Sequence, residues 1–180
     1  MDVDVAEART GLGGLTVTVI GDPRPARILP VIPYDPNGEV PACGGFVAPD
    51  GFFEGNAFYC EADDFVAWDN VGLFPNLWTE IGDFAIGLVL ADEWGRAVQA
   101  RAGLATDGPE AQLQVDCMAG VWTAALIPED NPTGILLSAG DLEEGISGFL
   151  ALSATPGLEG EVSAFQRFEA FKAGFFDGIT

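Results

Sequence analysis

Short apolar stretches alternate with polar residues through the first third of the chain, and glycine and proline separate them. Residues 15–19 alternate leucine or valine with threonine, which is the period-two pattern of a half-buried strand. Asp22-Pro23 and residues 30–36 carry prolines that favour turns and loops. Three further short strands are expected at residues 51–53, 57–60 and 65–68.

The period of the apolar positions changes at Gly82, and helices are expected from there on. The first spans residues 83–102 and ends at Gly103, a residue type favoured at helix C-termini. Its apolar positions recur at helical spacing: Phe84, Leu88, Ala91 and Gly95. A second helix runs from Pro109, which suits a first helical position, to about Leu126. One side of it carries Leu113, Cys117, Val121 and Ala125.

Two capping-box patterns predict the starts of two more helices. Asp141 with Glu144 opens a third helix that ends before Pro156, and Ser163 with Gln166 opens a fourth. The order of elements is therefore a small N-terminal antiparallel sheet and loop region, followed by about four helices. This order is typical of an α+β fold, here in a single compact domain.

Composition narrows the range of functions. The chain has 180 residues, 48% of them hydrophobic, and 28 Asp and Glu against 7 Lys and Arg, which gives a net charge of −21. This hydrophobic content predicts a folded domain and excludes an acidic disordered tail. So few basic residues argue against a nucleic acid or an anionic membrane surface as the partner. The absence of histidine excludes Ser-His-Asp and Cys-His catalysis and imidazole metal ligands.

Neither a membrane span nor an export signal is expected within this chain. No stretch supplies the run of about 20 apolar residues that a membrane-spanning helix needs. The first ten residues are acidic and lack the basic start of a secretory signal peptide.

A series of short motifs follows in a fixed order between residues 41 and 178. They are Ala42-Cys43-Gly44, Phe58-Tyr59-Cys60, Ala62-Asp63-Asp64, Gly82-Asp83-Phe84-Ala85, residues 90–99, residues 113–122, residues 140–144, residues 163–167, Phe171 and Gly174-Phe175. In this order they resemble the neutral zinc metallopeptidase family of bacterial membrane-anchored or exported proteins. The resemblance implies a zincin-like fold, with a strand-and-loop extension over residues 1–40 and a metallopeptidase-like domain over residues 41–180. It also implies an extracytoplasmic location: secreted, periplasmic or envelope-associated.

The sequence differs from the family at the residues that bind the metal. Zincins carry His-Glu-x-x-His on the first long helix, where the two histidines bind zinc and the glutamate activates water. The aligned residues here are Asp92-Glu93-Trp94-Gly95-Arg96. The position of the family's third ligand, a glutamate, aligns with Gln112, and that of its supporting aspartate with Asp116. Of the residues that the mechanism requires, Glu93 and Asp116 are retained.

These replacements predict that no zinc binds and that Glu93 is inactive. Arg96 is decisive because a guanidinium has no lone pair to donate and carries a permanent positive charge. Asp92 and Arg96 are four residues apart in the orientation that favours an ion pair, and Glu93 can join them. In the family, a metal ion supplies the positive charge in the active-site cleft. We expect the ion pair of Asp92 and Arg96 to balance the charge there instead. Without the resemblance, the same stretch is an ordinary amphipathic helix with Glu93 paired or solvated.

The resemblance also pairs Cys43 with Cys60. A disulfide between them would place the protein in an oxidising compartment outside the cytosol. Cys117 lies in the middle of a predicted helix and is expected to be a buried thiol.

Two other groups of residues have a structural and a functional interpretation. One group is aromatic, and we expect it either to line a peptide groove or subunit interface or to form part of the core: Phe46, Phe52, Phe53, Phe58 and Tyr59. The other group consists of three acidic clusters, at residues 61–64, 129–130 and 141–144. We expect them either to bind calcium, although none has the spacing of an EF-hand, or to form a solvated surface suited to a basic partner.

Three functions are consistent with these residues. The first is a zincin-like pseudoenzyme that serves as a binding or structural subunit of an extracytoplasmic assembly, with a basic protein or an extended peptide segment as its partner. The second is a hydrolase or peptidase in which Glu93, Asp92 and Asp116 hold Mg²⁺ or Ca²⁺, against which Arg96 argues. The third is that the acidic surface itself is the functional feature of a larger assembly.

Overall fold

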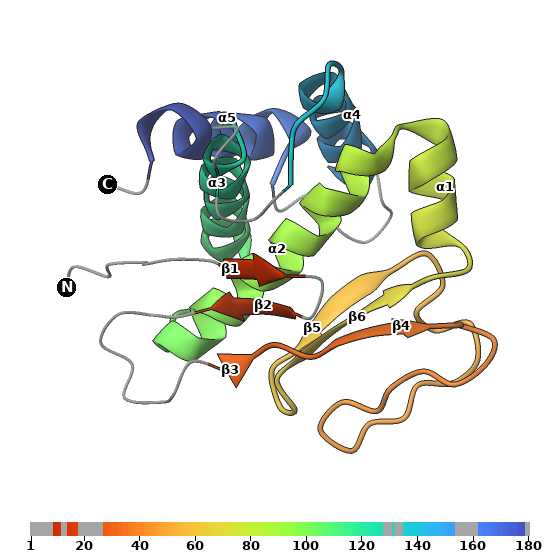
Figure 1. Cartoon of the computed structure of the whole chain (residues 1–180). Coiled ribbons are helices and arrows are strands. Elements are labelled where there is room, and N and C mark those ends of the chain that lie inside the picture. The colour runs from red at the N-terminus through yellow and green to blue at the C-terminus, as the bar shows by residue number, and fades with distance from the viewer. Residues whose placement is uncertain are drawn as a thin grey trace.

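The long helix α2 (Asp83–Ala102) organises the fold. The computed structural model describes residues 9–11, 14–17, 27–127, 131, 135–153 and 162–178. Within these ranges, α2 contacts α3 (Pro109–Ala125) and α4 (Asp141–Ser153) on one side and the strands on the other, and α5 (Ala164–Asp177) packs on α3. In Figure 1, α3, α4 and α5 lie above α2 and the strands between residues 31 and 69 lie below it, while the N-terminal strands cross in front of it. The mixed α+β class predicted from the sequence is confirmed.

A first sheet is formed by three short antiparallel strands in the order β1-β2-β3. These are β1 (Arg9–Gly11), β2 (Gly14–Val17) and β3 (Arg27–Ile28). The alternating pattern that starts at Leu15 is therefore a strand, as predicted. Val19 and the expected turn at Asp22-Pro23 lie outside the described residues.

A second sheet lies against α2 and has the order β4-β6-β5. Its strands are β4 (Val31–Tyr34), β5 (Ala57–Cys60) and β6 (Phe65–Asp69). The sheet is mixed, because β4 is parallel to β6 whereas β5 is antiparallel to it. The small antiparallel sheet that the sequence predicts is therefore found in β1-β2-β3, whereas this second sheet departs from it through the parallel pair of β4 and β6. Strand β4 belongs to the expected N-terminal extension (residues 1–40), and β6 belongs to the expected metallopeptidase-like domain (residues 41–180). Because the two strands pair, this sheet contains residues from both segments.

Two local predictions in this half of the chain are wrong. Residues 30–36 were expected to form a loop because of their prolines, yet they contain β4. Pro33 is tolerated there because β4 is an edge strand, so its missing N–H leaves no gap in the interior of the sheet. Residues 51–53 form a turn and not a strand, with the Glu54 N–H donating to the Gly51 carbonyl (3.1 Å) and Gly51 at φ +73°.

The two long helices have the bounds that the sequence predicts. Gly103 follows α2 in the left-handed conformation (φ +70°), which closes the C-terminus of that helix as expected. Pro109 occupies the first turn of α3, where its missing N–H leaves no bond unmade. The capping box of Ser163 and Gln166 at the start of α5 is also confirmed.

Helix α4 begins at Asp141 and ends before Pro156, as predicted, but its expected capping box is not formed and α1 is an additional helix. Asp141 does not form a capping box with Glu144. The Asp141 carboxylate accepts from the Ser138 N–H (2.6 Å), and that of Glu144 accepts from the Phe84 N–H (3.1 Å). Glu144 therefore satisfies a donor at the N-terminus of α2. Helix α1 (Leu73–Glu80) was not predicted, and it brings the number of helices in the described ranges to five.

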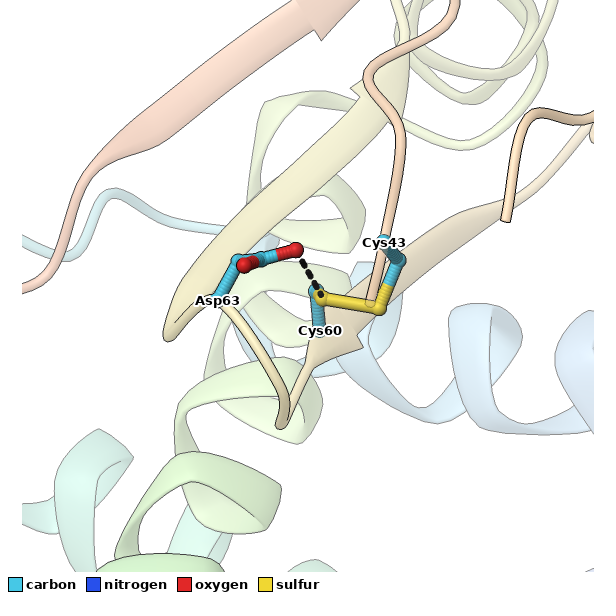
Figure 2. Close-up of side chains that lie close together, drawn as sticks. All are labelled: Cys43, Cys60 and Asp63. Atoms are coloured by element: carbon cyan, nitrogen blue, oxygen red, sulfur yellow. Dashed lines mark hydrogen bonds between the residues drawn. A yellow bond between two sulfur atoms is a disulfide. The ribbon is translucent and has the colours of Figure 1, made fainter. Parts of the chain in front are cut away.

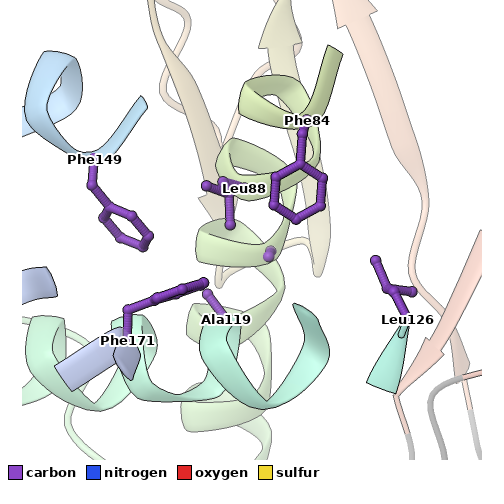
Figure 3. Close-up of a cluster of buried hydrophobic side chains, with 7 residues drawn as sticks. Phe84, Leu88, Ala119, Leu126, Phe149 and Phe171 are labelled. Carbon is purple, nitrogen blue, oxygen red and sulfur yellow. The ribbon is translucent and has the colours of Figure 1, made fainter. Parts of the chain in front are cut away.

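The main apolar core lies where α2, α3, α4 and α5 meet (Figure 3). It consists of Phe84, Leu88, Ala91, Ala119, Leu126, Phe149 and Phe171. None of the described helices is long and apolar enough to cross a membrane.

Helices α3 and α5 cross in direct backbone contact. A Cβ atom added at Gly120 would lie 2.0 Å from the carbonyl oxygen of Phe171, and one added at Gly174 would lie 1.9 Å from that of Cys117. Both positions therefore require glycine. This close approach holds α5 against the part of α3 that carries the polar residues described next.

Candidate functional site

The residues aligned with the zincin metal site form a polar network between α2, α3 and α5. Helix α2 contributes Asp92 and Arg96, α3 contributes Gln112 and Asp116, and α5 contributes Arg167. The structure thus brings together four positions that the sequence singled out, although they lie on two different helices. We call these five residues the polar network.

Arg96 is held by groups from three segments. Its Nη2 lies 3.3 Å from Asp92 Oδ2, which confirms the expected ion pair. The same nitrogen donates to Gln112 Oε1, and Nη1 donates to the Thr106 carbonyl (3.2 Å). Its Nε is 4.0 Å from Oε2 of Glu93. The guanidinium is therefore fixed inside the network, and its side chain is only 26% exposed.

Gln112 connects the two carboxylates of the network. Its Nε2 donates to Asp92 Oδ1 (2.9 Å) and to Asp116 Oδ1 (3.2 Å), while its Oε1 accepts from Arg96. A glutamate at this position, as in the family that the sequence resembles, would bring a third carboxylate and could not donate to the other two. The neutral amide is suited to this arrangement because it both donates and accepts.

Arg167 is a member of the network that the sequence did not indicate as a site residue. It is 6% exposed and makes a two-pronged contact with Asp116, with Nε–Oδ2 at 3.0 Å and Nη2–Oδ1 at 2.7 Å. Its Nη2 also lies 3.1 Å from Asp92 Oδ1. The motif of residues 163–167 contained it, but nothing local indicated that it pairs with a carboxylate 51 residues earlier.

Glu93 lies beside the network and is 7% exposed. Burial and the charge of Asp92 raise its pKa from the ordinary 4.5 to about 8, against the lowering effects of Arg96 and of a backbone hydrogen bond from Tyr59. Its Oε2 makes no hydrogen bond to any described residue. At neutral pH the side chain is therefore mostly a neutral acid.

The network balances its own charge when Glu93 is neutral. Two carboxylates, Asp92 and Asp116, then face two guanidinium groups, Arg96 and Arg167. Burial raises the pKa of Asp116 although the bonds from Arg167 oppose that rise. The pKa of Arg167 is raised because Asp116 and Asp92 outweigh the lowering effect of burial.

The residues of the network do not fit a zinc ion. Both oxygens of Asp92 are bonded, Oδ1 to Gln112 and Arg167 and Oδ2 to Arg96. Both oxygens of Asp116 accept from Arg167, and the Gln112 oxygen accepts from Arg96. A catalytic zinc site needs three protein ligands with free lone pairs. Among the fully buried side-chain atoms of these residues and Glu93, Glu93 Oε2 is the one that has no hydrogen-bond partner in the described part of the chain.

Two other groups of side chains bring potential metal ligands together in the described part of the chain. One contains Cys43, Cys60 and Asp63, but its sulfur atoms form a disulfide (Figure 2). The other contains Asp83, Asp141 and Glu144. Asp141 and Glu144 accept from backbone N–H groups, which explains their positions without an ion.

The disulfide between Cys43 and Cys60 confirms the pairing that the resemblance implied. It ties the segment before β5 to the end of that strand, and Asp63 accepts from the Gly44 N–H beside it (2.7 Å). Disulfides are typical of proteins in oxidising compartments outside the cytosol. Cys117 is half-buried, and burial together with the charge of Asp116 raises its pKa, so it is a thiol at neutral pH.

Comparison with known proteins finds relatives of the same description in two bacterial strains. The chain is 28% identical over 151 residues to the "Uncharacterized protein YpfJ" of Escherichia coli strain K12 and to that of an Escherichia coli O6:H1 strain. The alignment covers 67% of this chain and 50% of each relative, so the chain spans about half the length of these curated relatives. No family model and no solved structure matches it. The function therefore has to be inferred from the site.

Proposed function

We propose that this chain is a zincin-like metallopeptidase scaffold without peptidase activity, and that it serves as a binding or structural subunit of an extracytoplasmic assembly. One observation carries the proposal: at two positions aligned with metal ligands, Asp92 and Gln112, and at the supporting position, Asp116, every side-chain oxygen is hydrogen-bonded or ion-paired within the network. Arg96 supplies a positive charge from within the protein, where the family places a cation.

The charge and the disulfide support the second half of the proposal. A net charge of −21 suits a basic protein as the partner. The negative surface raises the rate of association with a basic protein and repels competing acidic proteins. The disulfide supports a secreted, periplasmic or envelope-associated location.

Glu93 supports one alternative, a hydrolase with a cation held by carboxylates. Its buried Oε2, which accepts no hydrogen bond from a described residue, and its pKa near 8 are features that also occur in catalytic acids. For Mg²⁺ or Ca²⁺ to bind beside it, however, Asp92 and Asp116 would have to release Arg96 and Arg167. The stranded guanidinium groups would then face the cation directly.

Elemental analysis of untagged protein, purified without chelator and then dialysed against zinc, tests the proposal. We expect far less than one zinc per chain, and no hydrolysis of a fluorogenic peptide library. About one zinc per chain, or a chelator-sensitive peptidase activity that Glu93→Gln abolishes, would contradict it. Activity that needs Mg²⁺ or Ca²⁺ would support the alternative.

A gain-of-binding variant provides the positive control for the scaffold. Combining Asp92→His, Arg96→His and Gln112→Glu restores the ligand set of the family. If the scaffold is zincin-like, this variant binds one zinc per chain while the unaltered chain does not. A variant that folds, as judged by circular dichroism, yet binds no zinc would contradict the zincin-like scaffold.

A further inference from the structure

The loop between β4 and β5 carries an exposed apolar surface on the side of the molecule away from α3, α4 and α5 (Figure 1). Phe46, Val47 and Phe52 are 53%, 71% and 59% exposed. We call these three residues the loop patch. Of the aromatic residues expected in a groove or in the core, Phe46 and Phe52 are exposed, whereas Phe53, Phe58 and Tyr59 are half-buried.

The loop patch is fixed to the core of the sheet. The ring of Phe46 lies 5.7 Å from that of Phe52, which packs edge-on against Phe53 at 4.8 Å, and Phe53 stacks on Phe58 at 4.4 Å. Phe58 belongs to β5, so a continuous series of rings joins the surface to the sheet.

The backbone of this loop is also held in place. Cys43 and Phe46 exchange two backbone hydrogen bonds of 3.0 and 2.9 Å, and the disulfide joins Cys43 to β5. The Gly51 N–H donates to the Pro36 carbonyl (2.7 Å), which brings the two ends of the loop together. Because the patch is already ordered, the loop itself would lose little conformational entropy when a partner binds to it.

The surroundings of the patch are acidic. Between Ile28 and Gly95 the sequence has no lysine or arginine. Asp35, Asp50 and Glu54 are exposed in the same loop, and none of them forms an ion pair with another described residue. An exposed apolar centre with such a rim resembles one half of an interface whose other half is apolar and basic.

We propose that the loop patch is the docking site for a partner protein segment in which an apolar anchor residue is flanked by lysine or arginine. The anchor packs on Phe46 and Phe52, and the flanking cations pair with Asp35, Asp50 and Glu54. A second copy of this chain does not fit, because it would bring one acidic rim against another. The inference extends the proposed binding role, but it shares no residue with the polar network.

Fluorescence anisotropy with three labelled peptides tests the proposal on the full chain. The first peptide has a tryptophan flanked by lysines, the second replaces the tryptophan by serine, and the third replaces the lysines by glutamates. We expect only the first to bind well, with several-fold weakening when salt rises from about 50 to about 300 mM. Equal binding of the serine peptide would mean that charge alone attracts it, and would overturn the proposal.

Variants then locate the binding site. Phe46→Ser combined with Phe52→Ser should weaken binding of the tryptophan–lysine peptide about tenfold or more. Asp50→Asn combined with Glu54→Gln, which leaves the rings intact, should weaken it and reduce its salt dependence. The matched control is Phe165→Ser on α5, which removes a ring that is 72% exposed and should change affinity by less than about twofold.

Two outcomes of this experiment would overturn the docking site while leaving the proposed function standing. One is unchanged peptide affinity in both loop variants. The other is a dimer of the unaltered chain, seen by light scattering, that Phe46→Ser with Phe52→Ser dissociates. Zinc binding or peptidase activity would contradict the proposed function without affecting the docking site.

Discussion

At the scale of single residues, ion pairs within one helix could be predicted from the sequence, whereas the pairing of Arg167 with a residue of another helix could not. The ion pair of Asp92 with Arg96 could be predicted because four residues along a helix bring two side chains to one face. The pairing of Arg167 with Asp116 depends on how α5 lies across α3, which no local pattern specifies. The position of Gln112 was predicted by alignment, but its role in bridging two carboxylates was not.

Removing Arg167 should destabilise the protein strongly. Arg167→Ala leaves Asp116, which is fully buried, without its two-pronged partner, and stranding a buried charge costs about 3–5 kcal/mol. Urea unfolding measures the free energy of unfolding. The control is Lys172→Ala on the same helix, whose exposed ion pair with Glu169 (2.9 Å) is worth at most about 1 kcal/mol. Equal losses in the two variants would contradict the role given to Arg167.

Glu93 should make stability depend on pH. Its pKa is about 8 in the folded chain and near 4.5 when unfolded, so between these values the folded state binds more protons than the unfolded state. Its stabilising contribution is complete below pH 4.5 and is lost as the pH rises through 8. Glu93→Gln, which stays neutral, should therefore gain stability relative to the unaltered chain as the pH rises from 4.5 to about 8. A difference in unfolding free energy that does not change with pH would contradict the buried neutral acid.

At the scale of elements, the sequence specifies the helices better than the strands. The bounds of α2 and α3 follow from their apolar spacing, from Gly103 and from Pro109, all of which act locally. Strand β4 could not be predicted, because its partner β6 is more than thirty residues away and its prolines indicate a loop. The short helix α1 has no side-chain cap at its N-terminus and no acidic residue in its first turn, so it gave no start signal.

The crossing of α3 and α5 should not tolerate a methyl group. Gly120→Ala places a Cβ atom 2.0 Å from the Phe171 carbonyl oxygen, so the helices must separate at a cost of about 1–3 kcal/mol or more. The control is Gly148→Ala in α4, where the nearest atom is 3.4 Å away and a helical alanine should be neutral or stabilising by up to about 1 kcal/mol. Thermal unfolding followed by circular dichroism compares the two. Gly120→Ala with an unchanged melting temperature would contradict the close crossing.

At the scale of the whole molecule, three arginines of the described helices are used in internal pairs. Arg96 and Arg167 pair inside the polar network, and Arg101 lies 2.9 Å from Asp64 with only 7% of its side chain exposed. The excess of acidic residues is therefore left to the surface, where it repels copies of the same chain and attracts basic proteins. Net charge could be read from composition, but this internal use of arginine required the packing of the helices.

The uninterrupted stretch without lysine or arginine has a consequence for how the protein is analysed. Trypsin cuts only after those two residues, so complete digestion releases a single large fragment that begins at Ile28 and ends at Arg96. That fragment contains both Cys43 and Cys60. In a mass spectrum, reducing the disulfide would add two hydrogen masses to one peptide and would not separate two peptides. A search for linked peptide pairs would therefore miss this bond, and mapping it needs a protease that cuts between the two cysteines, after an acidic or an aromatic residue.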